Sequence, residues 1–338
     1  MNNFLNSKNI LFSMLLLTII IVSGCSDQSD TSDNEGEEAY NLSLATETAD
    51  DHSFTIAANK FAESVEEDSD GRLTIDVFPN GELGGGTETL EQLQLGDLDM
   101  AVNGGPAHAP IVPEMSIVNL PFAFDTREEA YDVIDGELGE IQFDLLEENG
   151  IKGLSWWEDG FFQITTNTGP IETPDDMKGV KIRVPEIEIR QDTFKALGAN
   201  PVPMSFTELF SALQQNVVDG QTNGLSTVYS SNFYEVQDYL SIIPVTWSSA
   251  VLEISSDKWD SLPKDLQDIL QENADEYRDF QRELTQEEDE ELVSKLEDEG
   301  MDVNEVDDLT PFKEKTETVY EEYEDVFGKD LMDLMPEN

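Results

Sequence analysis

Arg183 is the residue of this chain whose type and setting most clearly point to chemistry. It stands in MKGVKIRVPE, residues 177–186, in a chain of 338 residues with 74 acidic and only 18 basic side chains. Apolar residues alternate with Lys181 and Arg183, which predicts a short strand that carries its cations on one face and ends before Pro185. A planar guanidinium can bind a carboxylate through two parallel hydrogen bonds. Taken alone, these residues favour the alternative, an ion pair with a structural Asp or Glu.

Motifs for other chemistry are absent from the sequence. It contains no phosphate-binding glycine loop, dinucleotide fingerprint, HExxH zinc motif or GxSxG nucleophile elbow. His52 and His108 are the two histidines, and no nucleophile motif accompanies either. Carboxylates from distant segments can pair in space as they do in glycosidases, so a secreted acidic hydrolase stays as an alternative. We expect no cofactor, no metal site and no catalytic role.

The formal net charge of −56 excludes some partners. A charge of this sign repels nucleic acid and anionic lipid surfaces, so we expect no nucleic-acid partner. The acidic excess is spread along the whole chain, which favours adaptation to a saline, halophilic setting. An acidic calcium buffer is the alternative, but no calcium-binding loop of the EF-hand pattern occurs.

The N-terminal segment has the pattern of an export signal. Lys8 precedes an apolar run, residues 10–22, that is too short for a comfortable membrane span. Small residues then precede Cys25, the only cysteine, in a pattern that resembles the bacterial lipobox. We therefore predict a lipoprotein signal peptide over residues 1–24, a lipid on Cys25 and an acidic flexible tether over 25–39. The alternative is an ordinary secretory signal with an incidental cysteine.

Strand and helix patterns alternate around these residues. Their order indicates βαβ units, a parallel sheet and flanking helices, and a restart of the rhythm near Gly160 suggests two α/β lobes. Residues 262–300 can form one long helix whose acidic run, 287–291, is interpreted as a solvated face. Strands are predicted at residues 40–46, 71–79, 151–157, 161–167, 179–184 and 200–206, helices at 53–68, 126–150 and 189–198, and a helix leading into a strand at 87–103.

Three blocks follow one another along the chain: DMKGVKIRVPE, LGANPVPMSFTELFSALQQNVVDGQTN and NFYEVQDYL. In order and approximate spacing they closely resemble the signature of the solute receptors of tripartite ATP-independent periplasmic (TRAP) transporters, of the dicarboxylate-receptor type. The segments FPNGELGG, LEQLQLGDLDMA and LPFAFDTREEAYDV extend the likeness over nearly the whole chain beyond the tether.

The resemblance implies an α/β, two-lobed periplasmic-binding-protein-like fold. Each lobe would be a sheet flanked by helices, with a long helix spanning both lobes. Lobe one would comprise residues 40–159 and 249–288, and lobe two residues 160–248 and 289–338. Closure of the lobes on a ligand would occur by hinge bending.

The resemblance also implies ligand-binding roles. Arg183 would bind the ligand carboxylate, and Asn223 would donate a hydrogen bond, although an asparagine there could simply form a turn. Phe206 would pack on the ligand, or serve only to open a helix with Ser205 as N-cap and Glu208 in a capping box. Two loop residues that fall near ligand-facing positions complete the expected set: Glu47 and Asn103.

Phe162 departs from the family pattern. Many members have a second arginine after the strand that ends in tryptophan, where this chain has Phe162 within DGFFQITTN. An ionised carboxylate without a partner is costly to bury, so Phe162 favours a monocarboxylate, a 2-oxo acid or a zwitterion. Arg190 or Lys181 could instead serve a second ligand carboxylate.

The function implied is that of an extracytoplasmic receptor. It would deliver a small organic acid to the small and large integral membrane subunits of a TRAP transporter, and the lipid on Cys25 would anchor it to the outer face of the cell membrane. A zwitterionic compatible solute such as ectoine is an alternative ligand, although TNGLSTVY lacks the aromatic pair expected for ectoine. An acidic surface protein without a ligand is a third hypothesis.

Overall fold

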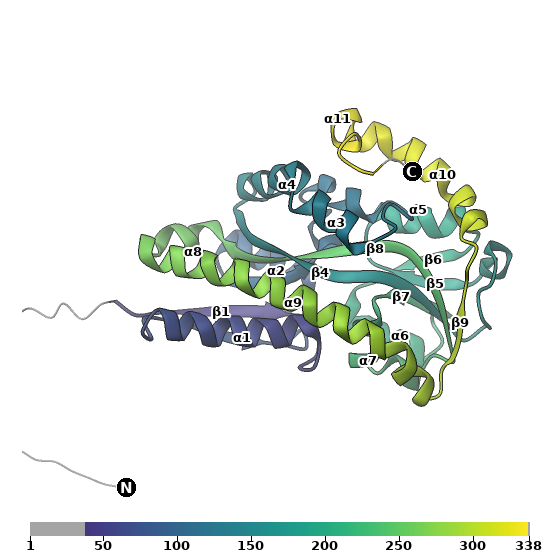
Figure 1. Ribbon diagram of the computed structural model, residues 1–338, viewed down its shortest axis with the longest axis horizontal. Coiled ribbons are helices and arrows are strands. Elements are labelled where there is room, and N and C mark those ends of the chain that lie inside the picture. The colour runs from purple at the N-terminus through teal and green to yellow at the C-terminus, as the bar shows by residue number, and fades with distance from the viewer. Residues whose placement is uncertain (1–37, 337–338) are drawn as a thin grey trace, which may run out of the picture. The chain divides into compact units, whose positions relative to one another are not determined.

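One mixed sheet of nine strands runs through residues 38–336, the part of the chain that the computed structural model describes (Figure 1). The strand order is β2-β1-β3-β8-β4-β7-β5-β6, and β9 pairs with β8. The strands are β1 (Tyr40–Thr46), β2 (Leu73–Phe78), β3 (Met100–Gly104), β4 (Ile151–Thr166), β5 (Lys181–Val184), β6 (Asn200–Pro203), β7 (Gly220–Asn223), β8 (Tyr239–Ser255) and β9 (Asp302–Glu305).

Two parallel groups of strands flank a long antiparallel pair. Strand β1 is parallel to β2 and β3, and β5 is parallel to β6 and β7. Between these groups, β4 and β8 pair antiparallel from Ile151↔Ser255 to Thr166↔Tyr239. The first group joins β8 and the second joins β4, so the sheet regions of the two lobes form one continuous sheet.

Helices lie on both faces of this sheet, as the βαβ pattern predicts (Figure 1). Helix α9 is a single helix that contacts α1 and β4 near its start and α7 and β9 farther along, so it spans both lobes. The helices are α1 (Ser53–Asp68), α2 (Gly86–Leu95), α3 (Arg127–Ile134), α4 (Glu137–Glu148), α5 (Glu188–Ala196), α6 (Phe206–Gln214), α7 (Leu225–Ser230), α8 (Ser256–Ser261), α9 (Lys264–Asp298), α10 (Thr310–Phe327) and α11 (Lys329–Met332), with 3-10 segments η1 (Gly105–His108), η2 (Pro113–Asn119), η3 (Pro174–Met177) and η4 (Phe233–Glu235).

The predicted strands 151–157 and 161–167 are the two halves of β4. The register with β8 shifts between Glu158 and Gly160, which identifies a local irregularity of the bulge type. Gly160 has a φ of +95°, a conformation that residues with a Cβ rarely adopt. The glycine therefore lets the strand continue through the irregularity instead of ending there.

Two other sequence predictions were wrong in detail. The single helix predicted over 126–150 is divided into α3 and α4, because the backbone is extended at Gly136. A Cβ on Gly136 would lie 2.7 Å from the carbonyl oxygen of Asp132, so glycine permits this close turn. Strand β9 follows the long helix and was missing from the predicted strands; it adds to β8 as a parallel strand.

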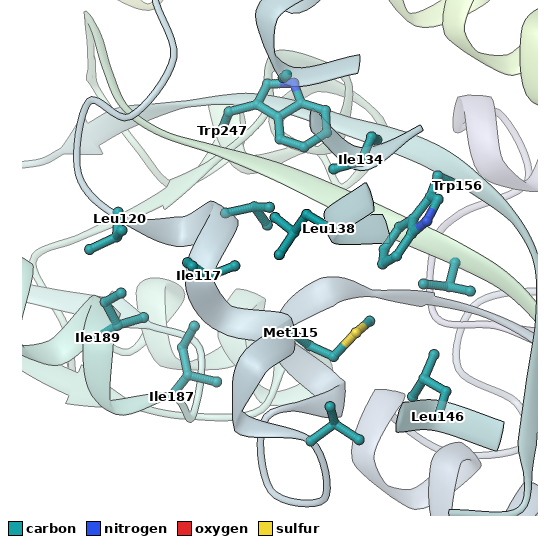
Figure 2. Packing of buried hydrophobic residues seen from close by; sticks show 14 of the residues in the cluster. Met115, Ile117, Leu120, Ile134, Leu138, Leu146, Trp156, Ile187, Ile189 and Trp247 are labelled. Carbon is teal, nitrogen blue, oxygen red and sulfur yellow. The ribbon is translucent and has the colours of Figure 1, made fainter. Parts of the chain in front are cut away.

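Apolar clusters cover both faces of the sheet. One packs α1 and α9 against the β1, β3 and β8 region, with Phe61 and Leu270 among its buried residues. Another joins η2, α3 and α4 to the start of α5, where Ile117 and Leu120 lie close to Ile187 and Ile189 (Figure 2). This second cluster therefore links residues assigned to lobe one with residues assigned to lobe two.

Nowhere in residues 38–336 does a helix combine the length and the apolar character needed to cross a bilayer. Cys25 and most of the predicted tether lie outside the described residues.

Candidate ligand-binding site

A cavity of about 330 Å³ lies where the carboxyl ends of the two parallel strand groups face each other. Residues that follow or end β1, β3, β5, β6 and β7 all contribute to its lining. Ligands of open α/β sheets bind beyond these strand ends. The lining residues are Glu47, Gly85, Gly86, Thr87, Glu88, Gly104, Pro106, Ala107, Pro110, Asp159, Phe162, Arg183, Pro185, Glu186, Met204, Ser205, Phe206, Thr207 and Asn223.

Arg183 is a buried cation on the cavity wall. Its side chain projects from β5, and both Nε and Nη2 donate to the carbonyl oxygen of Met204, at 3.0 and 2.7 Å. Met204 follows β6, which pairs in register with β5, so the sheet itself fixes the orientation of the guanidinium. Only 3% of Arg183 is exposed, in contrast to the neighbouring Lys181, which is exposed.

The charge of Arg183 has no ion-pair partner among residues 38–336, and its Nη1 has no hydrogen-bond partner there. The structural ion pair that the residues alone favoured is therefore wrong for the described chain. Burial lowers the pKa of Arg183 to about 10, and the charges of Glu47 and Glu186 oppose this effect. The side chain thus presents an oriented, charged donor to the cavity, which suits a carboxylate.

Asn223 and Phe206 both line the cavity, as the resemblance implies. Asn223 ends β7 opposite Gln163 of β4, and its amide donates to the side-chain oxygen of Gln221. Phe206 begins α6 and contacts Phe233 edge to face, with ring centroids 6.2 Å apart. Its two candidate roles, ligand contact and packing, are therefore both compatible with its position.

Ser205 is the N-cap of α6, but the predicted capping box is not formed. Its side chain makes no capping hydrogen bond to the helix backbone. Instead, Ser205 Oγ lies 3.1 Å from a carboxylate oxygen of Glu208. The Ser205 hydroxyl and Glu208 thus satisfy each other at the cavity edge.

Glu47 lines the cavity just after β1 and accepts a hydrogen bond from the backbone N–H of Gly86 at 3.2 Å. Burial raises the pKa of Glu47, although that hydrogen bond and the charge of Arg183 act in the opposite direction. The cavity therefore contains carboxylate as well as guanidinium groups.

Asn103 does not belong to the cavity lining. Its side chain is turned into a buried network, where Nδ2 donates to Glu253 at 2.8 Å and Oδ1 accepts from Thr89 at 3.0 Å. Glu253 also contacts His108 Nε2 at 2.9 Å, and its carboxylate raises the pKa of the buried His108 against the lowering effect of burial. Asn103 and His108 thus brace β3 and η1 behind the site.

Phe162 lines the cavity from β4, and the cation behind it is Arg190. The guanidinium carbon of Arg190 lies 4.4 Å from the centroid of the Phe162 ring. Arg190 is completely buried on α5 and donates from Nε to Asn119 Oδ1 at 2.9 Å. Burial lowers the pKa of Arg190 to about 9, so the side chain is charged at neutral pH. Of the two cations considered for a second carboxylate, Arg190 alone borders the cavity wall, since Lys181 is exposed.

Asp159 is a lining residue that sequence reasoning did not identify. It lies at the irregularity in the middle of β4. Burial raises the pKa of Asp159 to about 7; Arg190 lowers it, and Glu47 is among the acids that raise it. The one feature of the sequence that could have identified Asp159 is its place beside Gly160, where the alternation of strand and helix patterns begins again.

Next to Asp159, the completely buried Glu158 ties three elements together. Its carboxylate accepts hydrogen bonds from Arg127 Nε at 2.8 Å, from Trp247 Nε1 at 3.2 Å and from the hydroxyl of Tyr131. Arg127 also pairs with Asp289 of α9. Asp289 is thus a half-buried member of the acidic run that was interpreted as a solvated face, and burial raises its pKa to about 7.

Metal binding has no visible candidate in this region. Residues 38–336 contain no group of three or more His, Cys, Asp or Glu side chains arranged to hold a metal ion.

Comparisons with known proteins agree with this architecture. The model of the DctP family, described as bacterial extracellular solute-binding protein, family 7, matches residues 44–325. The C4-dicarboxylate-binding protein DctB of Bacillus subtilis is 36% identical over 280 residues, which cover 82% of this chain and 80% of the relative.

Two solved structures are also similar. The sugar acid binding protein DctPAm of Advenella mimigardefordensis, in complex with galactonate, has a TM-score of 0.86 and 33% identity, and the match covers 88% of this chain and 96% of that one. A TRAP periplasmic solute-binding protein of Polaromonas sp. JS666, bound to D-erythronate, has a TM-score of 0.85 and 32% identity, with 87% and 97% covered.

Proposed function

This chain belongs to the family 7 bacterial extracellular solute-binding proteins, the receptors of TRAP transporters, and we propose that it captures a small acid with one carboxylate beside Arg183. As a receptor it binds and delivers this solute without a catalytic step. The observation that carries the proposal is the buried Arg183 guanidinium, which lines a 330 Å³ cavity without an ion-pair partner in residues 38–336. Burying an unpaired cation is costly, and a ligand carboxylate offsets that cost.

The rest of the cavity supports a single carboxylate. Phe162 presents an apolar ring where the resemblance places a second arginine, and among residues 38–336 no cation other than Arg183 lines the wall. Galactonate and D-erythronate, the ligands of the two similar structures, each carry one carboxylate and several hydroxyl groups. Hydroxyl groups would donate to Glu47 and Asp159, while Asn223 and Phe206 would contact the remainder of the ligand.

A zwitterionic compatible solute such as ectoine is the second candidate. Glu47 and Asp159 favour it, because their carboxylates give the cavity an attraction for a positively charged group. In a hydroxy acid, Glu47 and Asp159 would contact hydroxyl groups, whereas in a zwitterion they would contact the positively charged group. Replacing both acids, as in Glu47→Gln/Asp159→Asn, should weaken a zwitterion more than it weakens a hydroxy acid.

We further propose that the lobes, residues 40–159 with 249–288 and residues 160–248 with 289–338, close on the ligand by bending near Gly160. The register shift between Glu158 and Gly160 supports this hinge, as does the pairing of these residues with Ser249 and Ser248 at the proposed boundary. The hydrogen bond from Arg190 to Asn119 joins the two proposed lobes. Closure of the lobes would change the geometry of this contact.

The receptor would hand its ligand to the small and large integral membrane subunits of the transporter at the outer face of the cell membrane. A lipid on Cys25 would hold it there, with residues 25–39 as a tether. Replacing Cys25 with Ser should release the protein from membranes or leave its signal uncleaved. Mass spectrometry that finds an unmodified native N-terminus at another residue would contradict the anchor.

A ligand screen tests the function directly. Thermal shift in molar sodium chloride, followed by calorimetry, would compare butyrate, 2-oxobutyrate, galactonate, glucuronate, sialic acid, succinate, malate and ectoine. The proposal expects a saturable response to a monocarboxylate or a hydroxy acid. It fails if succinate or malate binds the native protein more tightly than every monocarboxylate tested.

A further inference from the structure

A buried cation with unused donors lies directly behind the cavity wall. Nη1 and Nη2 of Arg190 are both buried and have no hydrogen-bond partner in residues 38–336, and only Nε is bonded, to Asn119. Buried polar atoms in folded proteins almost always have a partner. Two orphaned donors therefore leave the Arg190 guanidinium able to bind an acceptor that the described residues do not supply.

The aromatic ring of Phe162 separates this cation from the cavity. Phe162 is one of the lining residues, whereas Arg190 is not among the lining residues of the described chain, and the Arg190 guanidinium carbon lies 4.4 Å from the centroid of the Phe162 ring. An arginine stacked on an aromatic face is attracted by the ring, so the contact holds both side chains in place. Asp159 is the carboxylate whose charge acts on Arg190, but the two side chains form no ion pair.

We propose that Arg190 is a second anion-binding group of this site and that Phe162 keeps it from the ligand. The inference rests on the proposed function, in which Arg183 binds the first carboxylate. The Phe162–Arg190 pair then decides between acids with one carboxylate and acids with two. With the ring in place, a second carboxylate meets an apolar surface. With the ring removed, two free donors of a planar fork face the cavity, and such a fork suits a carboxylate.

Succinate and butyrate provide the test, because these four-carbon acids differ by one carboxylate. Calorimetry in molar sodium chloride would compare the native protein, Phe162→Ala and Phe162→Ala/Arg190→Met. The first variant should improve succinate affinity relative to butyrate by at least about tenfold, and the double variant should lose that gain. The proposal is overturned if Phe162→Ala shows no relative gain for succinate, or if the gain persists without Arg190.

Lys181 supplies the matched control. Phe162→Ala/Lys181→Met removes the exposed cation at the start of β5 and should keep the whole gain. If Arg190→Met prevents folding, as judged by melting curves, Arg190→Lys retains the charge without the fork and should keep only part of the gain. If Arg183→Ala leaves butyrate affinity unchanged, the proposed function fails. If Arg183→Ala weakens butyrate binding but Phe162→Ala does not change the affinity for succinate relative to butyrate, only the role of Arg190 is removed.

Discussion

Arg183 and Arg190 are both buried arginines near one cavity, and their surroundings give them different roles. Arg183 is fixed by the carbonyl of Met204 and lines the cavity, whereas Arg190 lies behind Phe162. The sequence drew attention to Arg183, because a cation inside an apolar strand is unusual in so acidic a chain. The residues alone favoured a structural ion pair, and only the family resemblance implied a role in ligand binding. The sequence could not choose between Arg190 and Lys181 as a second cation, because the contact of Arg190 with Phe162 joins α5 to β4, and no spacing rule connects those segments.

Asp159 predicts a pH dependence of stability. Its folded-state pKa of about 7 lies above the ordinary value of 3.8, so the folded state binds more protons between these two pH values. Stability from this group is therefore lost as the pH rises through that range. Asp159→Asn should remove this loss, and after solvent screening should stabilise the protein at pH 8 by on the order of 2 kcal/mol.

Urea unfolding at pH 5 and pH 8 measures this effect. The stability difference between Asp159→Asn and the native protein should be larger at pH 8 than at pH 5. The exposed Asp97→Asn serves as the control and should show little difference at either pH. An Asp159→Asn effect of the same size at both pH values would contradict the account.

Among the elements, β4 and β8 were the hardest to predict, and they organise the site. Helix α1 and the long helix α9 were predicted well because their apolar periodicity is local. The continuity of β4 depends on pairing with β8, some ninety residues farther along the chain, and on the positive φ of Gly160. A local pattern of apolar residues around a glycine therefore suggested two strands where the folded protein has one.

The contacts of Glu158 with Arg127, Tyr131 and Trp247, here called the Glu158 network, predict that α3, β4 and β8 stabilise one another. Through Arg127 the network also reaches Asp289 of α9. Arg127→Met leaves the completely buried Glu158 without its cation, although Tyr131 and Trp247 still donate to it. Removing one member of a buried ion pair typically costs about 3 kcal/mol or more. The free energy of unfolding should fall by about that amount, and Arg127→Met/Glu158→Gln should recover part of the loss.

Arg278 is the control for this prediction. It pairs with Asp275 and Asp279 on the surface of α9, where ion pairs contribute about 1 kcal/mol or less. Arg278→Met should therefore have a small effect in the same denaturation experiment. Equal losses for Arg127→Met and Arg278→Met would show that the Glu158 network does not join α3, β4 and α9.

At the scale of the molecule, the net charge of −56 shapes both stability and ligand capture. The field of so many carboxylates repels an anionic ligand, so the local charge of Arg183 must overcome it at short range. Salt screens the long-range repulsion more than it weakens a buried contact. We therefore expect saline conditions to favour both folding and ligand binding.

Sodium chloride is expected to raise the melting temperature. The Debye length falls from about 10 Å at about 0.1 M to about 3 Å at about 1 M, which relieves repulsion among the acidic side chains. Differential scanning fluorimetry across this range should show a steady rise at pH 7. Near pH 4 the rise should shrink, because many carboxylates are then protonated. A flat or falling curve at pH 7 would contradict the saline adaptation.

Calorimetry of Arg183 variants tests the central claim most directly. A charge-assisted hydrogen bond contributes about 1.5–3 kcal/mol, so Arg183→Ala should weaken binding of the best acid from the screen at least about tenfold. Arg183→Lys keeps the charge but not the fork and should restore only part of the affinity. Lys181→Ala, two residues earlier on the same strand, should bind like the native protein. A folded Arg183→Ala protein with native affinity would remove Arg183 from the site and contradict the account.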